Sequence, residues 1–374
     1  MEPEFPEDVV LDDRTAEVFR LLEKQAASVL YVTGTCGVGK STLGMRVGHM
    51  FARQVGEPFW AIDLCHAAPA FPLAQQVTRL LGKSSREARE DRGVLLLDNV
   101  DEALVGCGLA PGSTGLWSTA TAEGMNPPRL VILTATQRAW SSRVQSWEVS
   151  PLGLPTSPGR DLSVAVSDAG ALFLRAARRA GAGWTLDERT YLLVVALCHV
   201  AMGVPQALIE LAQVSVRTPL EVLAAASDNQ LAAFLDAAGS AYLRKIRGRL
   251  AAMSDAVREL HVALALVDGT VESEVGLALA RALDGRREGL LLWRDAVLAG
   301  LLVSASVGNG LYFGMPRLIR AVAAEWLVVG ERSLQLREIC SGLRVTSSSS
   351  WQGARLLSAL DDSEPGLQQA GATR

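Results

Sequence analysis

The glycine-rich segment GTCGVGKS, residues 34–41, constrains the fold of this chain more than any other feature of its sequence. It satisfies the pattern G-x-x-x-x-G-K-[ST], in which backbone N–H groups turn inward around phosphate oxygens. The preceding run SVLYVTG (28–34) is apolar and predicts a strand, and the residues after the loop predict a helix. A strand, this loop and a helix in direct succession predict an α/β domain with a phosphate-binding loop.

The residues of this loop have distinct expected roles toward a nucleotide. Lys40 is expected to reach the β- and γ-phosphates, and the Ser41 hydroxyl to ligate Mg²⁺. The positive end of the following helix points at the same negative charge. The alternative is a glycine-rich turn with a chance lysine. We expect ATP or ADP to be bound by the loop residues Gly34, Thr35, Cys36, Gly37, Val38, Gly39, Lys40, Ser41 and Thr42.

An acidic strand end follows further along the chain. The run VLLLD (94–98) ends in the carboxylate of Asp98. Because Mg²⁺ prefers oxygen ligands, we expect Asp98 to hold the metal through water, and Asp101 or Glu102 to orient the attacking water. The alternatives are an ordinary turn residue at position 98 and a solvated helix start at positions 101 and 102. Lys40, Asp98 and Asp101 are the expected catalytic residues.

Hydrophobic periodicity divides the chain into two halves. Apolar runs at 59–63, 93–98 and 129–134 alternate with helical patterns such as 73–81, which predicts a parallel sheet with crossover helices. The segment 107–128 is rich in Gly, Pro, Ser and Thr and predicts a loop. From about Ser167 onward the pattern is helical.

Three local signals organise the helical half. Thr185 and Glu188 form a capping-box pattern that predicts a helix start, and Pro205 predicts another. Residues 301–315 predict a β-hairpin that turns around VGNG (307–310). Helices followed by a two-stranded ribbon make a winged helix a plausible interpretation. We expect a nucleotide-binding domain (1–155), a helical domain (156–232), a winged-helix-like domain (233–340) and a fraying tail (341–374).

Composition excludes several classes of function. With 36 Lys and Arg against 40 Asp and Glu, no global positive field draws the chain to nucleic acid or to an anionic membrane. The five cysteines contain no C-x-x-C pair, which argues against zinc and against a disulfide framework. The acidic start lacks the order of a signal peptide, and the uncharged stretches 190–209 and 296–316 contain too many polar residues for a membrane span. We expect a cytoplasmic protein without membrane contact.

The order of these motifs resembles a known family. GTCGVGKST, VLLLDNVDEA, VILTATQR and MGVPQALIELA follow one another as in the STAND class of signal-transduction ATPases with an NB-ARC module. LLLDNVDEAL is similar to the L-D-N-x-E-H stretch of large bacterial ATP-binding transcriptional regulators. Residues 251–280 and 311–327 resemble the winged-helix region of that family. The resemblance covers about residues 8–340.

The resemblance implies roles for three further residues. DDRTAE (12–17) resembles the motif G-R-E-x-E, which implies that Arg14 lies near the nucleotide, although Asp13 stands where glycine is usual. GVP (203–205) resembles the motif G-x-P, whose proline, here Pro205, packs on the adenine. VILT (131–134) resembles the sensor strand, which implies that Thr134 lies near the γ-phosphate.

The chain departs from the family at two places. Thr136 occupies the position of an arginine that follows the sensor threonine, and Arg138 comes two residues later. Met315-Pro316-Arg317 stands where the family has M-H-D, whose histidine contacts the β-phosphate of ADP. Proline has no donor for that contact. Arg317 could replace the histidine, or it could belong with Arg320 to a solvated basic face.

The leading functional hypothesis is an ATP/ADP-dependent signalling switch with slow ATP hydrolysis, in which nucleotide clamps the three domains. Its expected partners are the nucleotide and, on activation, another protein or further copies of the chain. The alternative is a DNA-binding transcriptional regulator with an ancillary nucleotide site. The basic clusters at 244–249 and 286–287 are the candidates for DNA contact, and a solvated helix face is their other interpretation. A phosphoryl-transfer enzyme with a small-molecule acceptor is a third hypothesis, which the long helical half disfavours.

Overall fold

The computed structural model describes residues 10–25, 29–64, 93–100, 128–136, 145–155, 167–267, 269–284, 289–307, 310–327 and 336. The chain divides into two compact units: residues 1–150 with 298–300, and residues 151–297 with 301–374. None of the helices in the described ranges combines the length and hydropathy that a membrane crossing requires.

The first unit is built on a parallel β-sheet, as the alternation of apolar runs predicts. Its elements are α1 (Val10–Gln25), β1 (Val29–Thr33), α2 (Lys40–Val55), β2 (Phe59–Asp63), β3 (Val94–Asp98), β4 (Leu130–Thr134) and β5 (Gln145–Glu148). The five strands lie in the order β2-β3-β4-β1-β5, and every pair is parallel. The strand β1, which leads into the loop at 34–41, therefore lies between β4 and β5.

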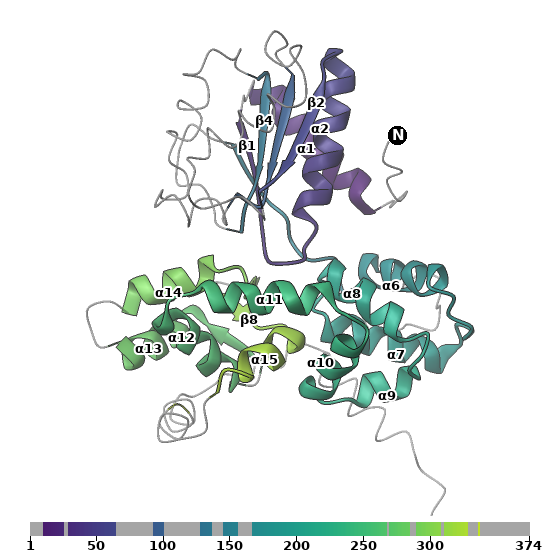
Figure 1. Ribbon diagram of the computed structural model, residues 1–374, viewed down its shortest axis with the longest axis vertical. Helices are drawn as coiled ribbons and strands as arrows, with labels where there is room; N and C mark the ends of the chain where they lie inside the picture. The colour runs from purple at the N-terminus through teal and green to yellow at the C-terminus, as the bar shows by residue number, and fades with distance from the viewer. Residues whose placement is uncertain are drawn as a thin grey trace, which may run out of the picture. The chain divides into compact units, whose positions relative to one another are not determined.

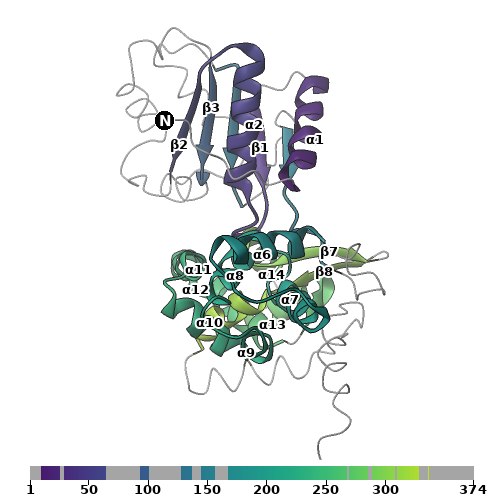
Figure 2. The same ribbon diagram turned by 90° about the vertical axis from the view of Figure 1, so that its right-hand side faces the viewer.

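Alternation of side chains along the strands gives the sheet two apolar faces. On one face, Leu30 of β1 and Ile132 of β4 join a buried cluster with Val18 of α1 and with Leu43 and Val47 of α2. Figure 1 and Figure 2 show both helices on that side of the sheet. On the other face, residues such as Tyr31 of β1 form a second buried cluster. The central strands are thus covered on both faces, as parallel sheets require.

Two glycines of α2 face the sheet at positions where a larger side chain has no room. A Cβ on Gly44 would come within 3.0 Å of the Leu96 side chain, and one on Gly48 within 2.2 Å of the Phe59 ring. The first turn of α2 lies at the carboxyl edge of the sheet, where Ser41 donates to Asp98.

The second unit is mainly helical. Its elements are α6 (Asp168–Arg179), α7 (Glu188–Val200), α8 (Pro205–Val214), α9 (Leu220–Ala225), α10 (Asp228–Ala237), α11 (Ala241–Ala252), α12 (Asp255–Ala265), β6 (Thr270–Glu272), α13 (Ser273–Asp284), α14 (Gly289–Leu298), β7 (Val303–Val307), β8 (Gly310–Gly314) and α15 (Arg317–Ala324). The predicted hairpin is confirmed, since β7 and β8 pair antiparallel with Val307 opposite Gly310, and β6 adds a third strand in the order β6-β8-β7.

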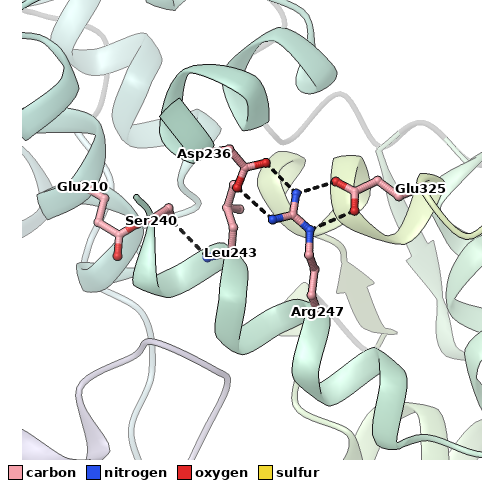
Figure 3. A network of polar contacts seen from close by, with 6 residues as sticks. All are labelled: Glu210, Asp236, Ser240, Leu243, Arg247 and Glu325. Carbon is pink, nitrogen blue, oxygen red and sulfur yellow. Dashed lines mark hydrogen bonds and ion pairs between the residues drawn. The ribbon is translucent and has the colours of Figure 1, made fainter. Parts of the chain in front are cut away.

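The helix α15 packs against α10, α11 and α12. Arg247 of α11 donates to both carboxylate oxygens of Asp236 on α10 at 2.8 and 2.6 Å. It also donates to Glu325, the residue that ends α15, at 2.9 and 2.7 Å. Figure 3 shows the guanidinium between the two carboxylates. Nearby, Glu210 of α8 accepts from the N–H of Tyr242 at 2.9 Å and so caps the start of α11.

Two sequence predictions are corrected in this unit. The capping box at Thr185 is wrong: α7 starts at Glu188, and the carboxylate of Asp187 accepts from the N–H of Thr190 at 2.7 Å. Aspartate caps a helix as well as threonine does, and Asp187 directly precedes the first residue of α7. The expected boundary at 232/233 falls inside the continuous helix α10.

The end of the first domain also differs in detail from the expected residue 155. Residues 151–155 belong to the second unit, because the N–H of Leu152 donates to Gly203 at 2.9 Å and the carbonyl of Pro155 lies 3.1 Å from His199 Nε2. The predicted helix at 73–81, most of the predicted loop at 107–128 and the tail at 341–374 lie outside the described residues.

Candidate nucleotide-binding site

The loop between β1 and α2 has the backbone conformation of an anion cradle. Gly34, Gly37 and Gly39 have φ values of 145°, 77° and 101°, which side chains other than glycine rarely adopt. At Gly34 there is also no room, because a Cβ would lie 2.5 Å from the carbonyl oxygen of Val149. The glycines of the sequence pattern are therefore required by the conformation of the loop.

The start of α2 leaves its backbone donors available. Its N-cap is Gly39, which has no side chain to accept from the first N–H groups, and the first turn contains no acidic residue. By contrast, α6, α10, α11 and α12 each begin with a serine whose hydroxyl accepts such a bond. An uncapped helix start carries partial positive charge and binds anions.

Lys40 lies along the loop itself. Its Nζ donates to the carbonyl oxygens of Gly34 at 3.0 Å and Thr35 at 2.9 Å, so the ammonium lies against the loop. The hydroxyl of Thr35 is buried and has no hydrogen-bond partner among the residues that the structure describes. A buried hydroxyl without a partner costs about 1–3 kcal/mol, which a phosphate oxygen at this place would relieve. The loop thus fits a phosphate chain.

Asp98 is the centre of a hydrogen-bond cluster at the carboxyl edge of the sheet. Its Oδ1 accepts from the hydroxyl of Ser41 at 2.8 Å and from the hydroxyl of Thr134. Its Oδ2 accepts from the amide of Asn99 at 3.2 Å, and the N–H of Asn99 donates to Thr134 Oγ1 at 3.0 Å. The structure therefore brings together Ser41, Asp98 and Thr134, which the sequence places far apart.

These donors suit Mg²⁺. The Ser41 proton points to Asp98, so the lone pairs of the Ser41 oxygen remain for a metal ion. A hydroxyl and one carboxylate, completed by water and phosphate oxygens, are ligands that Mg²⁺ takes in phosphate sites. No group of three or more His, Cys, Asp or Glu that could hold a metal occurs among the described residues.

Sequence reasoning missed two polar residues of this cluster. Asn99 also donates from Nδ2 to Asp63 Oδ1 at 2.8 Å. Asp63 ends β2 and is paired in register with Asp98 at the end of β3. The signal was present in the sequence, since the runs FWAID and VLLLD both end in aspartate. The order of the strands was needed to see that these ends are neighbours.

The remaining predicted residues are distributed over both units. Arg14 of α1 donates to the carbonyl of Ser150 at 2.8 Å, and Cys36 and Thr136 are buried in the first unit. Asp101 and Glu102 lie outside the described residues. The contacts of Arg14 and Thr134 with a nucleotide stay predictions.

The motif GVP lies in the second unit at the start of α8. Gly203 has a φ of 69°, and a Cβ there would lie 2.3 Å from the Leu152 carbonyl, so glycine is required. Pro205 is the first residue of α8, which confirms the predicted helix start. Its packing on an adenine stays a prediction.

Met315, Pro316 and Arg317 lead into α15. Pro316 is buried and is the N-cap of the helix. Arg317 forms an ion pair with Asp228 and donates to the carbonyl of Ala226 at 2.8 Å. Arg320 lies 3.5 Å from the same carboxylate. The interpretation of a solvated basic face is therefore wrong, because Asp228 at the start of α10 pairs with both arginines.

Comparisons with known proteins find two kinds of similarity. No family model matches the chain. The uncharacterized proteins Rv0894 of Mycobacterium tuberculosis and Mb0918 of Mycobacterium bovis are 29% identical over 230 residues, which cover 57% of this chain and 52% of each relative. The chain spans about half the length of the curated relatives it matches.

Among solved structures, the Walker-type ATPase PABY2304 of Pyrococcus abyssi is 14% identical and has a TM-score of 0.48, covering 83% of this chain and 95% of that one. The ORC1 protein of Aeropyrum pernix in complex with DNA is 14% identical with a TM-score of 0.39, covering 87% and 94%. The STAND protein PH0952 of Pyrococcus horikoshii, with a tetratricopeptide repeat sensor, is 13% identical with a TM-score of 0.30, covering 93% and 45%.

All these TM-scores lie below 0.5, which is too low to assign the fold by similarity. The fold class is therefore assigned from the chain's own residues and sheet. A parallel sheet in the order β2-β3-β4-β1-β5, flanking helices and the loop GTCGVGKS between β1 and α2 define an α/β P-loop NTPase fold.

Proposed function

We propose that the chain is an ATP/ADP-dependent signalling switch of the STAND class, with an NB-ARC-like module and slow ATP hydrolysis. The observation that carries the proposal is the convergence of Ser41, Asp98 and Thr134 at one sheet edge, next to the loop that holds Lys40. These are the residue types that bind a triphosphate with Mg²⁺, and they come from α2, β3 and β4.

The chemistry is an in-line attack of water on the γ-phosphate. Lys40 supplies positive charge to the β- and γ-phosphates, and Ser41 and Asp98 are the residues that would hold Mg²⁺. When bound, Mg²⁺ neutralises the charge that develops on the phosphate oxygens. Asp101 is the proposed residue that orients the water. Because hydrolysis is slow in this proposal, its rate sets how long the chain stays in the ATP-bound state before it changes to the ADP-bound state.

The second unit supports a switch with a helical and a winged-helix part. The elements α12, β6, α13, α14, β7 and β8 follow one another as helix, strand, two helices and a hairpin, and the sheet order is β6-β8-β7. This is the succession that a winged helix has. We propose that α6–α11 form the helical part and α12–α15 the winged-helix part, and that nucleotide holds them with the P-loop domain.

DNA contact by the winged helix is the alternative function, and α14 disfavours it. This helix would be the one that enters a groove, yet Leu290 and Leu291 are 62% and 50% exposed on it, and Arg294 pairs with Asp295. Apolar side chains at this place favour a protein partner or a further copy of the chain over base edges. Salt-dependent binding of duplex DNA at physiological ionic strength would reverse this preference.

The proposal also includes a cytoplasmic location for the protein.

The test is to identify the nucleotide that co-purifies with the chain and to measure the particle mass with ADP and with a non-hydrolysable ATP analogue. The proposal predicts bound ADP and a larger particle, or a changed hydrodynamic radius, with the ATP analogue. Absence of nucleotide binding by calorimetry would refute the P-loop assignment. Binding without any difference between the two nucleotides would refute the switch and leave a nucleotide-binding domain.

A further inference from the structure

The carboxyl edge of the sheet contains a second carboxylate beside Asp98. Asp63 and Asp98 end two neighbouring parallel strands and are register partners. Adjacent strands lie about 4.8 Å apart, so the two negative charges are close. Asp63 is exposed, whereas Asp98 is partly buried under Ser41 and Thr134. Like charges at this distance repel each other unless a donor lies between them.

Asn99 is that donor. Its amide nitrogen donates to Asp63 Oδ1 at 2.8 Å and to Asp98 Oδ2 at 3.2 Å, which uses one N–H for each carboxylate. Its backbone N–H donates to Thr134 Oγ1 at 3.0 Å. Asn99 therefore connects the ends of β2, β3 and β4.

The backbone of Asn99 has a conformation of raised energy at the position from which these contacts are made. Its φ is 59°, in the left-handed region, where asparagine is among the few residues other than glycine that are tolerated. Residues kept in this region cluster at functional sites, where the surrounding bonds hold them. Here those bonds are the contacts with Asp63, Asp98 and Thr134.

We propose that Asp63 and Asn99 are a positioning pair for Asp98. Asp63 fixes the Asn99 amide, and the amide fixes Oδ2 of Asp98, so that the carboxylate is held in one orientation, in which it would bind Mg²⁺ through water. This inference rests on the proposed nucleotide function, because the metal is bound with the nucleotide. Partners that orient a metal-binding carboxylate typically change metal affinity by about tenfold to a hundredfold when they are removed. Since Asp63 is exposed, we expect the lower end of that range.

The experiment titrates Mg²⁺ into the full chain with a fluorescent ATP analogue and follows binding, with a parallel measurement in EDTA. Asp63→Ala raises the Mg²⁺ concentration at half effect by about tenfold and leaves the affinity in EDTA unchanged. Asp63→Asn keeps an oxygen acceptor and raises it by about threefold or less. Asn99→Gly keeps the left-handed backbone, removes the amide and matches Asp63→Ala.

The double variant Asp63→Ala with Asn99→Gly shows no further rise, because both changes break one chain of contacts. The matched control is Glu57→Gln. Glu57 pairs with Arg129 at 3.1 Å just before β2 and β4, at the opposite edge of the same sheet, and its loss leaves the Mg²⁺ dependence unchanged.

Three outcomes decide the matter. Equal effects of Asp63→Asn and Asp63→Ala would show that Asp63 acts by its charge alone and would overturn the positioning role. Additive effects in the double variant would also overturn it. A wild-type chain that binds the ATP analogue with no influence of Mg²⁺ would instead refute the proposed metal site, and the inference would fall with it.

Discussion

Replacing Lys40 by alanine tests the loop most directly. In the structure the ammonium donates to the carbonyls of Gly34 and Thr35 at 3.0 and 2.9 Å. Binding a nucleotide exchanges these neutral acceptors for charged phosphate oxygens. The two existing bonds already have an ionised donor, so the gain is the added attraction between the ammonium and an ionised oxygen, about 1 kcal/mol for each of two bonds at a water-exposed site. We therefore expect Lys40→Ala to weaken ATP binding by about 2 kcal/mol, or about thirtyfold in Kd.

The same variant keeps its fold. It loses two contacts between a partly exposed ammonium and loop carbonyls that water can reach, which is worth about 1 kcal/mol and shifts Tm by about 2–4 °C. The assay is calorimetric titration of ATP with Mg²⁺, together with a thermal melt of each protein. Arg53→Ala removes a positive charge from the last turn of the same helix, away from the loop, and is the matched control.

Equal ATP affinity in Lys40→Ala and wild type, with intact melting, would show that phosphate does not bind above the loop. A loss of the same size in Arg53→Ala would show that the net charge of the unit, not the position of the ammonium, controls binding.

Three further outcomes follow from the structure. Asp98→Asn keeps ATP affinity within about threefold but lowers Mg²⁺-dependent turnover by about a hundredfold. If the variant hydrolysed ATP at the wild-type rate, another carboxylate would have to bind the metal. On the proposed function, Pro316→His slows ADP dissociation by about tenfold, and an unchanged rate would show that this segment does not contact the nucleotide. Arg247→Ala lowers the free energy of unfolding at pH 7 by about 1–2 kcal/mol, more than Arg189→Ala, whose ion pair is exposed. The hydrogen bond from Arg247 lowers the pKa of Asp236 below its ordinary value of 3.8. The stabilisation is therefore present above pH 3.8 and is lost as the pH falls through the lowered pKa. If Arg247→Ala lowered the free energy of unfolding in urea equally at about pH 7 and at about pH 3, this reasoning would be contradicted.

Local signals in the sequence were sufficient for many elements of the fold. The loop at 34–41, the apolar strands around it and the start of α8 at Pro205 depend on residues that are neighbours in the chain. The hairpin of β7 and β8 has the same property. Motif, periodicity and turn chemistry act over a few residues, so they can be read without knowing the fold.

Elements that depend on packing were missed. β5 reads QSWE, with side chains that alternate between half-buried and exposed, and it is a strand because it pairs with β1 at the edge of the sheet. A short polar sequence has little strand preference of its own, since strand stability comes from cross-strand contacts.

The candidate site shows the same division. Lys40, Ser41 and Asp98 were identified from sequence because their motifs are local. The roles of Asp63 and Asn99 depend on β2 lying beside β3, and in a parallel sheet the neighbours are chosen by crossover connections, not by chain order. Arg317 pairs with Asp228, far away along the chain, for a similar reason. The sequence by itself determined which residues can bind phosphate, and the tertiary structure decided which carboxylates and amides surround them, because those contacts form only between segments that folding brings together.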